Sequence, residues 1–289
     1  MTNIAKAMQK FVVMGRTYLL TQLTTTGLCF EFHQLRHGPS WAWTTACVGS
    51  TLSEFGFTPR EILEIILSLR CKNGGWSYNP TVPADADSTL RVLQFLRKIG
   101  FEDKVIISQA EHFVALHQLP DGGISTYHED TVRDMGYSVY DGWCSSHPCV
   151  TALAINQLRD VTVLKRASFY LQNRLTQIGP EAYWWRTKYY VLYEIGKPNG
   201  GILKDDPVEI ALALLLKSKL GICDIDLVKR LILLQEDDGS LPPSGVFRIP
   251  RPNQLLEELI GDEEVVEDKK GIFSTCAAIV AVFRQLTLL

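Results

Sequence analysis

The stretch Pro83-Ala84-Asp85-Ala86-Asp87-Ser88-Thr89 carries more information about fold and chemistry than any other part of the chain. It follows the glycine turn Asn73-Gly74-Gly75-Trp76 and precedes an apolar-periodic run over residues 90–99. Two carboxylates therefore occupy the opening turn of a mostly apolar helix. Asp is a favoured capping residue and gains from the helix dipole, so capping alone is the simpler interpretation. One Asp is enough for that, and a second, two residues on, points elsewhere and favours a chemical role.

Helical patterns extend outward from this stretch in both directions. Apolar residues with i, i+3, i+4 spacing cover residues 62–69, 90–99, 150–158, 208–216, 227–234 and 272–286, and strand patterns are hard to find. Helix ends that lead into glycine-rich turns recur at Gln22, Arg70, Gln118, Gln172 and Gln235, which are 48, 48, 54 and 63 residues apart. We expect an all-α fold, an α/α barrel (toroid) of five to six helical hairpins, with residues 1–289 as a single domain.

The second helix of each predicted hairpin opens with polar or aromatic residues. In a closed ring these openings would meet at one end, which would gather acids, a histidine, tryptophans and positive helix ends. Besides the stretch at 85–89, the openings are Ser40-Trp41-Ala42-Trp43-Thr44, Ser145-Ser146-His147-Pro148, Trp184-Trp185-Arg186-Thr187, Asp205-Asp206-Pro207-Val208-Glu209 and Ile272-Phe273-Ser274-Thr275.

These motifs resemble those of a known family. The glycine turns over residues 69–76 and 116–123 resemble degenerate QW repeats of the terpene cyclases. Asp85-Ala86-Asp87-Ser88-Thr89 resembles the Asp-x-Asp-Asp-Thr-Ala motif of the class II terpene cyclases, which include the squalene–hopene cyclases, and residues 39–46 are similar to another segment of that family. The resemblance covers about residues 19–286, and the β subunits of protein prenyltransferases are related α/α barrels.

The resemblance implies a terpene cyclase of isoprenoid biosynthesis, an isomerase or intramolecular lyase. Asp87 would be the general acid that starts carbocation cyclisation, Asp85 the assisting carboxylate, and His147 the histidine that pairs with the acid. Ser88 stands where the motif has its third acid. The physical chemistry agrees, because close carboxylates and an apolar cavity both raise a carboxyl pKa. Aromatic faces would stabilise the cation, and the candidates are Trp41, Trp43, Trp76, Tyr140, Trp143, Trp184, Trp185 and Phe273.

Two other functions remain open at this stage. One is a prenyltransferase-like zinc barrel that works with a partner subunit, with Asp141, Cys144 and His147 as mixed ligands. The other is a noncatalytic isoprenoid-binding barrel. For the cyclase no metal or cofactor is expected, although a diphosphate substrate would bring Mg²⁺. Asp205-Asp206-Pro207-Val208-Glu209 looks like a class I magnesium motif but is typical of a helix start, and the acidic residues 262–268 are expected to form a solvated loop.

Composition excludes several partners and leaves others open. The net charge of −3 and the pI near 6.1 argue against a nucleic-acid-binding face. No apolar run approaches the ~18–20 residues that span a bilayer, and seven scattered cysteines indicate reduced thiols in a cytoplasmic protein. Phe11-Val12-Val13-Met14, flanked by basic residues, suggests peripheral membrane contact or, alternatively, an outer helix packed on the barrel. The pocket would be closed by the loop over residues 127–143, by a partner or by a homodimer.

Overall fold

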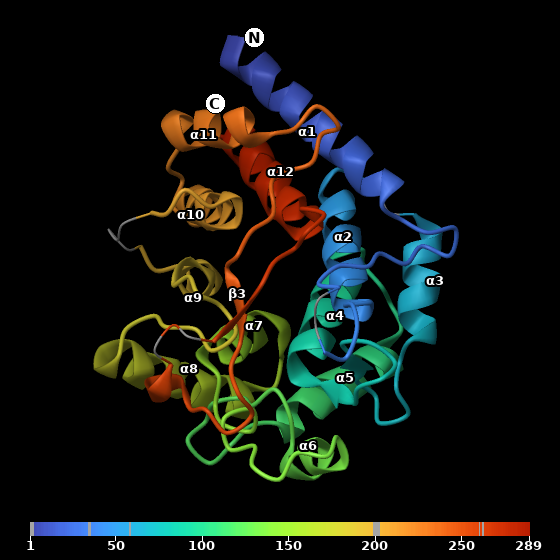
Figure 1. Cartoon of the computed structure of the whole chain (residues 1–289), viewed down its shortest axis with the longest axis vertical. Coiled ribbons are helices and arrows are strands. Elements are labelled where there is room, and N and C mark those ends of the chain that lie inside the picture. The colour runs from blue at the N-terminus through green and yellow to red at the C-terminus, as the bar shows by residue number, and fades with distance from the viewer. Residues whose placement is uncertain (1–2, 34–35, 58, 199–202, 260, 262) are drawn as a thin grey trace.

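Helices make up most of the molecule (Figure 1), as the sequence predicts. The computed structural model describes residues 3–33, 36–57, 59–198, 203–259, 261 and 263–289. The α-helices of this part of the chain are α1 (Asn3–Thr21), α2 (Ala42–Glu54), α3 (Arg60–Ser68), α4 (Ala86–Lys98), α5 (Lys104–Leu116), α6 (Glu129–Asp134), α7 (Pro148–Gln157), α8 (Val161–Gln177), α9 (Tyr189–Ile195), α10 (Pro207–Lys219), α11 (Ile225–Leu234) and α12 (Ile272–Leu286). A single 3₁₀ turn, η1, covers Leu256–Glu258.

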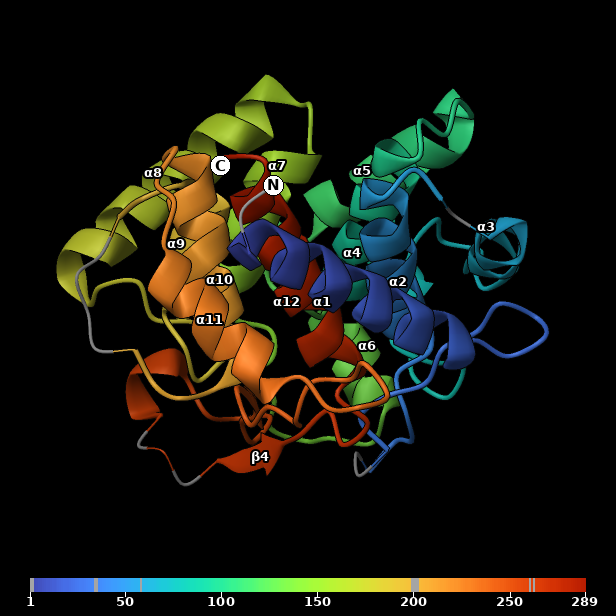
Figure 2. The same cartoon turned by 90° about the horizontal axis from the view of Figure 1, so that it is seen from above.

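Six helices pack against one another in chain order. Helix α2 contacts α4, α4 contacts α7, α7 contacts α9, α9 contacts α10, α10 contacts α12, and α12 contacts α2. Helices α1, α3, α5, α8 and α11 pack outside them, against α12, α2, α4, α7 and α10 respectively (Figure 2). Helices α2, α7 and α10 are buried over nearly their whole length, which explains why the sequence has small and apolar residues on more than one of their faces.

A turn with the same hydrogen bonds recurs along the chain. The amides of Cys71, Leu119 and Glu236 donate to the carbonyls of Gly75, Gly123 and Ser240 at 2.9, 2.8 and 3.0 Å. The amide of Thr24 donates to the carbonyl of Leu28 at 2.8 Å in the same way, so the turn gives a structural counterpart to four of the predicted positions: 22, 70, 118 and 235. The prediction at Gln172 was wrong, because this residue lies inside α8 (Val161–Gln177).

Each of these turns is joined to the helix that follows by a threonine hydroxyl. The threonine is the fourth residue after the N-cap of its helix, where its hydroxyl reaches a backbone amide of the turn segment. The bonds run from Trp76 N to Thr89 Oγ1, from Ile124 N to Thr151 Oγ1 and from Leu241 N to Thr275 Oγ1, each 2.9 Å, and from Cys29 N to Thr45 Oγ1, 3.0 Å. The repeat therefore satisfies a buried amide in the same way at four places.

Two short antiparallel strand pairs interrupt the helices. Strand β1 (Trp76–Ser77) pairs with β2 (Ala84–Asp85), and β3 (Phe247–Ile249) pairs with β4 (Glu264–Val266). The second pair corrects the prediction of a solvated acidic loop at 262–268. Glu263 is buried, and Asp268 is fully buried and accepts the amides of Ser244 and Ser274 at 2.6 and 2.7 Å. Asp262 lies outside the described residues.

The N-terminal apolar segment packs inward. Helix α1 (Asn3–Thr21) lies against α12 and α11, and Phe11 and Val12 are buried, whereas Val13 is 53% exposed. Burial of Phe11 and Val12 supports the packing interpretation of this segment over membrane contact. Of the helices in the described part of the chain, none has the length and apolar character needed to cross a bilayer.

Candidate active site

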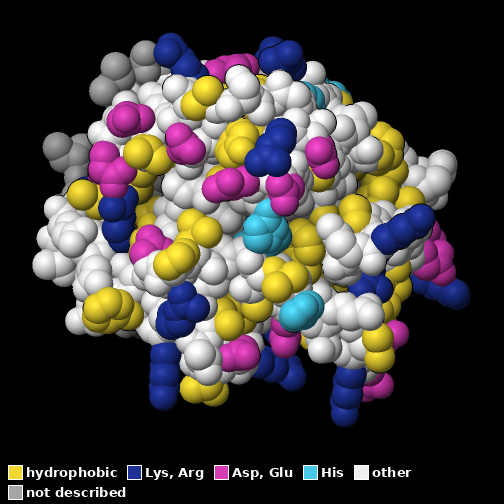
Figure 3. All heavy atoms as spheres, turned by 90° about the horizontal axis from the view of Figure 1, so that it is seen from below, with side chains coloured by type: hydrophobic (Ala, Val, Ile, Leu, Met, Phe, Trp, Pro, Cys, Tyr) yellow, Lys and Arg dark blue, Asp and Glu magenta, His cyan; other side chains and the backbone are white. Residues whose placement is uncertain are grey.

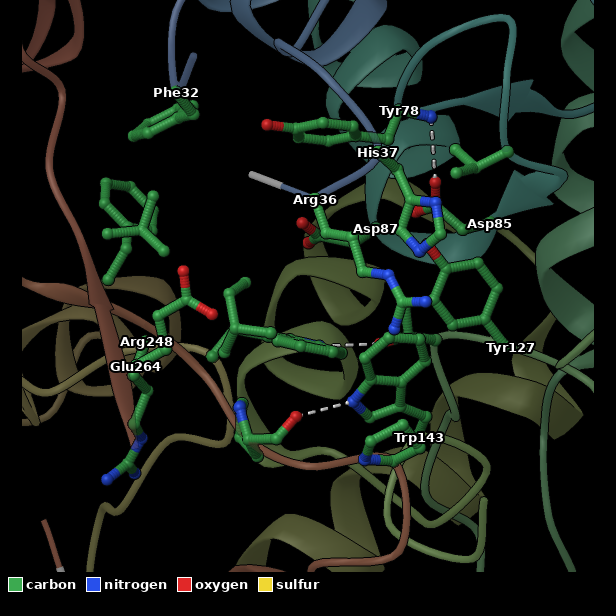
Figure 4. A pocket seen from close by; sticks show the side chains of 18 of the residues that line it. Phe32, Arg36, His37, Tyr78, Asp85, Asp87, Tyr127, Trp143, Arg248 and Glu264 are labelled. Carbon is green, nitrogen blue, oxygen red and sulfur yellow. Dashed lines mark hydrogen bonds between the residues drawn. The ribbon is translucent and has the colours of Figure 1, made fainter. Parts of the chain in front are cut away.

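A cavity of about 450 Å³ lies beside the N-terminal ends of α2 and α4 (Figure 4). Its walls come from residues 32 and 36–37, the opening of α2, the segment from residue 78 to the opening of α4, the loop over residues 126–143, the segment before α9, and the β3–β4 pair with the residues after β3. The loop over 127–143 was one of the alternatives expected to close the pocket, beside a partner and a second copy, and it contributes Tyr127, Met135, Tyr137 and Trp143.

Asp85 caps the helix on which the acid pair lies. Its Oδ1 accepts the amide of Ser88 at 2.7 Å, and its Oδ2 accepts the amide of Tyr78 at 3.1 Å. The side chain is 2% exposed, and burial together with the charge of Asp87 raises its pKa to about 7. Asp85 therefore plays the capping role that the sequence allowed for both carboxylates, although its carboxyl also borders the cavity.

Asp87 lies in the first turn of α4 and borders the cavity (Figure 4). Its Oδ2 accepts the indole N–H of Trp43 at 3.0 Å. Burial raises the pKa of Asp87, while the charge of Arg91 and the Trp43 hydrogen bond act in the opposite direction. A carboxyl in this setting can hold a proton and still release it as an acid.

His147 is bonded through both ring nitrogens to groups other than the acid pair. It is fully buried, its Nε2 lies 2.8 Å from the carbonyl oxygen of Gly142, and its Nδ1 lies 2.7 Å from Thr126 Oγ1. A carbonyl only accepts, so Nε2 donates to Gly142 and Nδ1 accepts the Thr126 hydroxyl proton. The Thr126 oxygen in turn accepts the indole N–H of Trp184 at 2.7 Å. Burial lowers the pKa of His147 to about 3, so the ring is neutral and orients Trp184.

The predicted aromatic residues fall into three groups. Trp43, Trp143, Trp184 and Trp185 line the cavity. Phe273 packs behind this wall, with its ring centroid 5.2 Å from that of Trp43 and 5.6 Å from that of Trp185.

The other three predicted aromatics contact different parts of the molecule. Trp76 is fully buried and donates to the carbonyl of Ile66 at 2.6 Å, Trp41 packs on Phe30, and Tyr140 accepts from Arg133 at 3.1 Å.

Several lining residues were missed by sequence reasoning. Tyr78 follows the glycine turn and could have been found by extending that motif by two residues. Phe247 lies on the three-residue strand β3, and its ring is 4.8 Å from Phe32 and 4.4 Å from Trp185. No sequence pattern predicts a strand this short, so the aromatic wall that it completes becomes visible only in three dimensions.

Charged side chains also line the cavity, a feature absent from the sequence prediction. They are Arg36, Arg248, Arg251, Glu263 and Glu264, and His37 lies among them. Arg248 is held by the carbonyls of Tyr183 and Ala182 and lies 3.6 Å from a carboxylate oxygen of Glu263. Figure 3 shows the face seen from below, where histidine and charged side chains lie among hydrophobic ones.

The metal interpretations do not fit this geometry. Asp141 is exposed, and both ring nitrogens of His147 are hydrogen-bonded to other groups. In the described part of the chain, no three His, Cys, Asp or Glu side chains come together as metal ligands would. Asp206, from the segment that looks like a class I magnesium motif, caps α10 by accepting the amides of Val208 and Glu209 at 2.9 and 3.1 Å.

Comparison with known proteins places the fold. No protein-family profile matches the chain, and no curated protein matches it either. Among solved structures, the type II terpene cyclase MstE from Scytonema, in complex with geranylgeranyl dihydroxybenzoate as substrate, superposes with a TM-score of 0.82 at 22% identity over 100% of both chains. A protein from Actinoplanes gives a TM-score of 0.83 at 23% identity over 96% of this chain and 99% of the other.

A third solved structure is a longer protein. The ent-copalyl diphosphate synthase from Streptomyces platensis gives a TM-score of 0.52 at 16% identity, and the match covers 85% of this chain and 50% of the synthase. The chain therefore has a class II terpene cyclase-like fold along its whole length. At these identities the likeness concerns the fold.

Proposed function

We propose that this protein is an enzyme that starts carbocation cyclisation of an isoprenoid substrate by protonating a carbon–carbon double bond from Asp87. The observation that carries the proposal is the difference between the contacts of the two carboxyls. Asp85 is engaged by the amides of Ser88 and Tyr78, whereas Asp87 borders an aromatic-walled cavity and is held through one oxygen.

The proposed chemical step moves one proton. The O–H bond of the Asp87 carboxyl breaks, the π electrons of the alkene form the new C–H bond, and the other alkene carbon becomes a cation. Further double bonds of the substrate then attack this cation to close rings, and loss of a proton ends the reaction. Burial raises the pKa of Asp87 and so favours its acid form, and apolar walls exclude water that would quench the cation.

The aromatic wall suits the intermediates of this reaction. Trp143, Trp184 and Trp185 present indole rings to the cavity, and each ring face contributes roughly 0.5–2 kcal/mol to a cation placed over it. The neutral state of His147 matters here, because a protonated imidazole behind Trp184 would repel the cation.

The substrate class follows from the cavity and from the comparison. A volume of about 450 Å³ is within the range of small-molecule sites. MstE binds geranylgeranyl dihydroxybenzoate, an isoprenoid chain on a polar head. We infer a substrate of this kind, with the chain against the aromatic wall and the head near the charged side chains of the cavity.

We also infer that the six mutually contacting helices close into one α/α barrel spanning residues 1–289 as a single domain. The contact of α12 with α2 supports closure, since it joins the last of these helices to the first. The loop over 126–143 and the β3–β4 pair contribute cavity walls from the same chain. A homodimer, peripheral membrane contact and a cytoplasmic location stay predictions.

Replacement of Asp87 tests the function directly. Purified protein is incubated with geranylgeranyl dihydroxybenzoate, geranylgeranyl diphosphate or squalene, and products are identified by mass spectrometry. We expect cyclised product from at least one, and a loss of at least about a hundredfold in rate for Asp87→Asn, because general-acid catalysis supplies about 10²–10⁴.

The fold of the Asp87→Asn variant is the control for this experiment. Circular dichroism and the unfolding midpoint of Asp87→Asn should match those of the native protein, which separates lost chemistry from lost fold. Conversion that survives Asp87→Asn would remove Asp87 as the acid. Binding of all three compounds without conversion would identify the protein as a noncatalytic binding barrel.

A further inference from the structure

A buried arginine lies next to the proposed acid, on the far side of an indole ring. Arg91 follows Asp87 by one turn of α4 and is 7% exposed. Its guanidinium carbon is 5.0 Å from the ring centroid of Trp43, a cation–π distance. The same indole donates its N–H to Asp87 Oδ2 at 3.0 Å. The Arg91 guanidinium thus contacts the Trp43 ring, and the same ring contacts the Asp87 carboxyl through its N–H.

The guanidinium is fixed by two further bonds. One nitrogen donates to the hydroxyl of Tyr190 at 2.9 Å and another to the side-chain oxygen of Gln94 at 2.8 Å. The Tyr190 ring stacks on Trp185, with centroids 3.9 Å apart and an interplanar angle of 13°. Arg91 is therefore held against the aromatic wall of the cavity, where its charge acts on Asp87.

A buried cation needs a counter-charge, because desolvation of an unpaired charge costs several kcal/mol. Glu194 is buried on α9, is bound by Asn156 at 2.7 Å, and interacts electrostatically with Arg91. Burial raises the pKa of Glu194, while Arg91, Lys219 and the Asn156 hydrogen bond act in the opposite direction, so the carboxylate form of Glu194 is the counter-charge available to Arg91 while Asp87 is protonated. Once Asp87 has lost its proton, the carboxylate is a second anion in the field of the same guanidinium.

The hydrogen bond to Trp43 assigns the position of the acidic proton. An indole N–H only donates, so Oδ2 of Asp87 is an acceptor, and because the carbonyl oxygen of a carboxyl accepts better than its hydroxyl oxygen, this bond favours the proton on Oδ1. When the proton leaves, the Trp43 bond becomes charge-assisted and strengthens. Trp43 and Arg91 thus both favour the Asp87 carboxylate, which exists after proton transfer, over the protonated carboxyl that exists before it.

We propose that Trp43 and Arg91 are positioning residues for the acid: Trp43 fixes the carboxyl so that Oδ1 delivers the proton, and Arg91 stabilises the carboxylate that remains. This inference rests on the proposed function of Asp87. It gives Trp43 a second role beside the cavity-lining one expected from the sequence.

Other titratable groups act on Asp87 from the elements around it and must be considered in a pH experiment. Burial raises the pKa of Cys47 to about 12 and of Cys149 to about 11, so both thiols are neutral near pH 7. Asp85, with a pKa of about 7, titrates within the working range and interacts with Asp87. The complete set is Cys47 on α2, Asp85 and Arg91 at α4, Tyr127 in the covering loop, Cys149 on α7, and Tyr190 and Glu194 on α9.

The first test measures the acid without any substrate. Aspartate carboxyl carbons are labelled with ¹³C, the Asp87 signal is assigned by its absence in Asp87→Asn, and its shift is followed from pH 3 to 10 by NMR. Trp43→Phe and Arg91→Met should each raise the pKa of Asp87 by about one unit or more, since each removes a group that favours the carboxylate. Arg91→Lys keeps the charge and should restore most of the difference.

The matched control is Trp185→Phe. Trp185 lines the same cavity and stacks on Tyr190, but its ring is not part of the Trp43–Asp87 bond. This variant should leave the Asp87 titration unchanged. An unchanged titration in a folded Trp43→Phe protein would overturn the inference, and this milder variant keeps the test valid if Arg91→Met does not fold.

The second test uses the reaction with geranylgeranyl dihydroxybenzoate. In Trp43→Phe and Arg91→Met the maximal kcat should fall at least about tenfold while the alkaline limb of the pH–rate profile moves to higher pH. A purely structural role would lower activity and leave the limb in place, which would contradict the inference. Trp185→Phe should raise KM with the limb unmoved. If the native protein converts none of the probes, the proposed function fails, whereas the NMR titration still decides the positioning roles.

Discussion

Two carboxyls only two residues apart have different roles because they leave the helix at different points. Asp85 is the N-cap, where a side-chain oxygen reaches a free amide of the first turn, and Asp87 is already inside that turn and borders the cavity. The sequence predicted that one Asp is enough to cap the helix and that the second has another role, and the assignment of that role to Asp87 came from the family resemblance. The sequence could not predict the bond from Trp43 to Asp87, because that bond depends on how α2 and α4 are placed side by side.

The relay from His147 through Thr126 to Trp184 makes a testable prediction at the same scale. Thr126→Val removes the hydroxyl and leaves the indole N–H and the imidazole Nδ1 without their partner. An unsatisfied buried polar group costs about 1–3 kcal/mol, so we expect a loss of this order in the free energy of unfolding. Urea denaturation followed by fluorescence measures it.

Thr126→Ser is the matched control for this relay. Serine keeps a hydroxyl at the same position, so its unfolding free energy should stay within about 1 kcal/mol of the native value. Equal stability of Thr126→Val and Thr126→Ser would show that the relay does not hold Trp184.

At the scale of elements, the recurring turn explains why glycine punctuates the chain. Gly122 has a φ of +93°, and a Cβ at this position would lie 2.4 Å from the carbonyl oxygen of Arg166 on α8. The outer helix therefore approaches the turn too closely for any side chain. Gly239 faces the same restriction from Met14 on α1, with the same distance of 2.4 Å to a carbonyl oxygen.

A pair of glycine substitutions separates contact from backbone strain. Gly122→Ala suffers both, whereas Gly100→Ala, at a φ of +69° with no neighbouring atom within 4 Å of its Cβ, suffers strain alone. We expect about 1–2 kcal/mol of destabilisation for Gly100→Ala and a clearly larger loss for Gly122→Ala. Differential scanning calorimetry of both variants measures their losses of stability. Equal losses would refute the close contact between Gly122 and Arg166.

The elements themselves could be predicted from the sequence to different degrees. Helix α12 begins and ends where its apolar pattern does, at Ile272 and Leu286, because it is long and strongly periodic. Strands β3 and β4 have three residues each, too few for an alternating pattern to emerge. Gln172 matched the predicted repeat by residue type alone, and α8 continues past it because no glycine follows until Gly179.

For the whole molecule, the walls of the cavity come from segments that are far apart in sequence. Phe32, Trp43 and Phe247 meet in one aromatic cluster, with ring centroids 4.8 to 5.9 Å apart. Sequence reasoning found Trp43 because it belongs to a helix opening. Phe32 and Phe247 carry no local signal, and only the packing of the complete chain brings them together.

The stability of the whole molecule should depend on pH through His117. Burial lowers its pKa to about 4, and its ring lies 4.0 Å from that of His128. In the unfolded chain a histidine has a pKa near 6.5. Between about pH 6.5 and pH 4 the unfolded chain therefore binds a proton at His117 that the folded protein does not bind. The free energy of unfolding consequently decreases as the pH falls through this window.

Replacement of His117 by phenylalanine should remove this loss. Relative to the native protein, the free energy of unfolding of His117→Phe should rise by roughly 1.4 kcal/mol per pH unit as the pH falls from 6.5 to 4. His112→Phe, at an exposed position of the same helix, is the control and should not change the slope. Parallel stability curves for native protein and His117→Phe would contradict the assignment.

The position of α12 has a consequence for the synthesis of the protein. This helix contacts α1, α2, α10 and α11 and follows all four along the chain, so it leaves the ribosome after them. Until then the nascent chain exposes the apolar surfaces that α12 later covers, and Glu31 lacks the amide of Ile272 that it accepts in the finished molecule. The packing of these four helices can therefore be completed only after residues 272–286 have emerged.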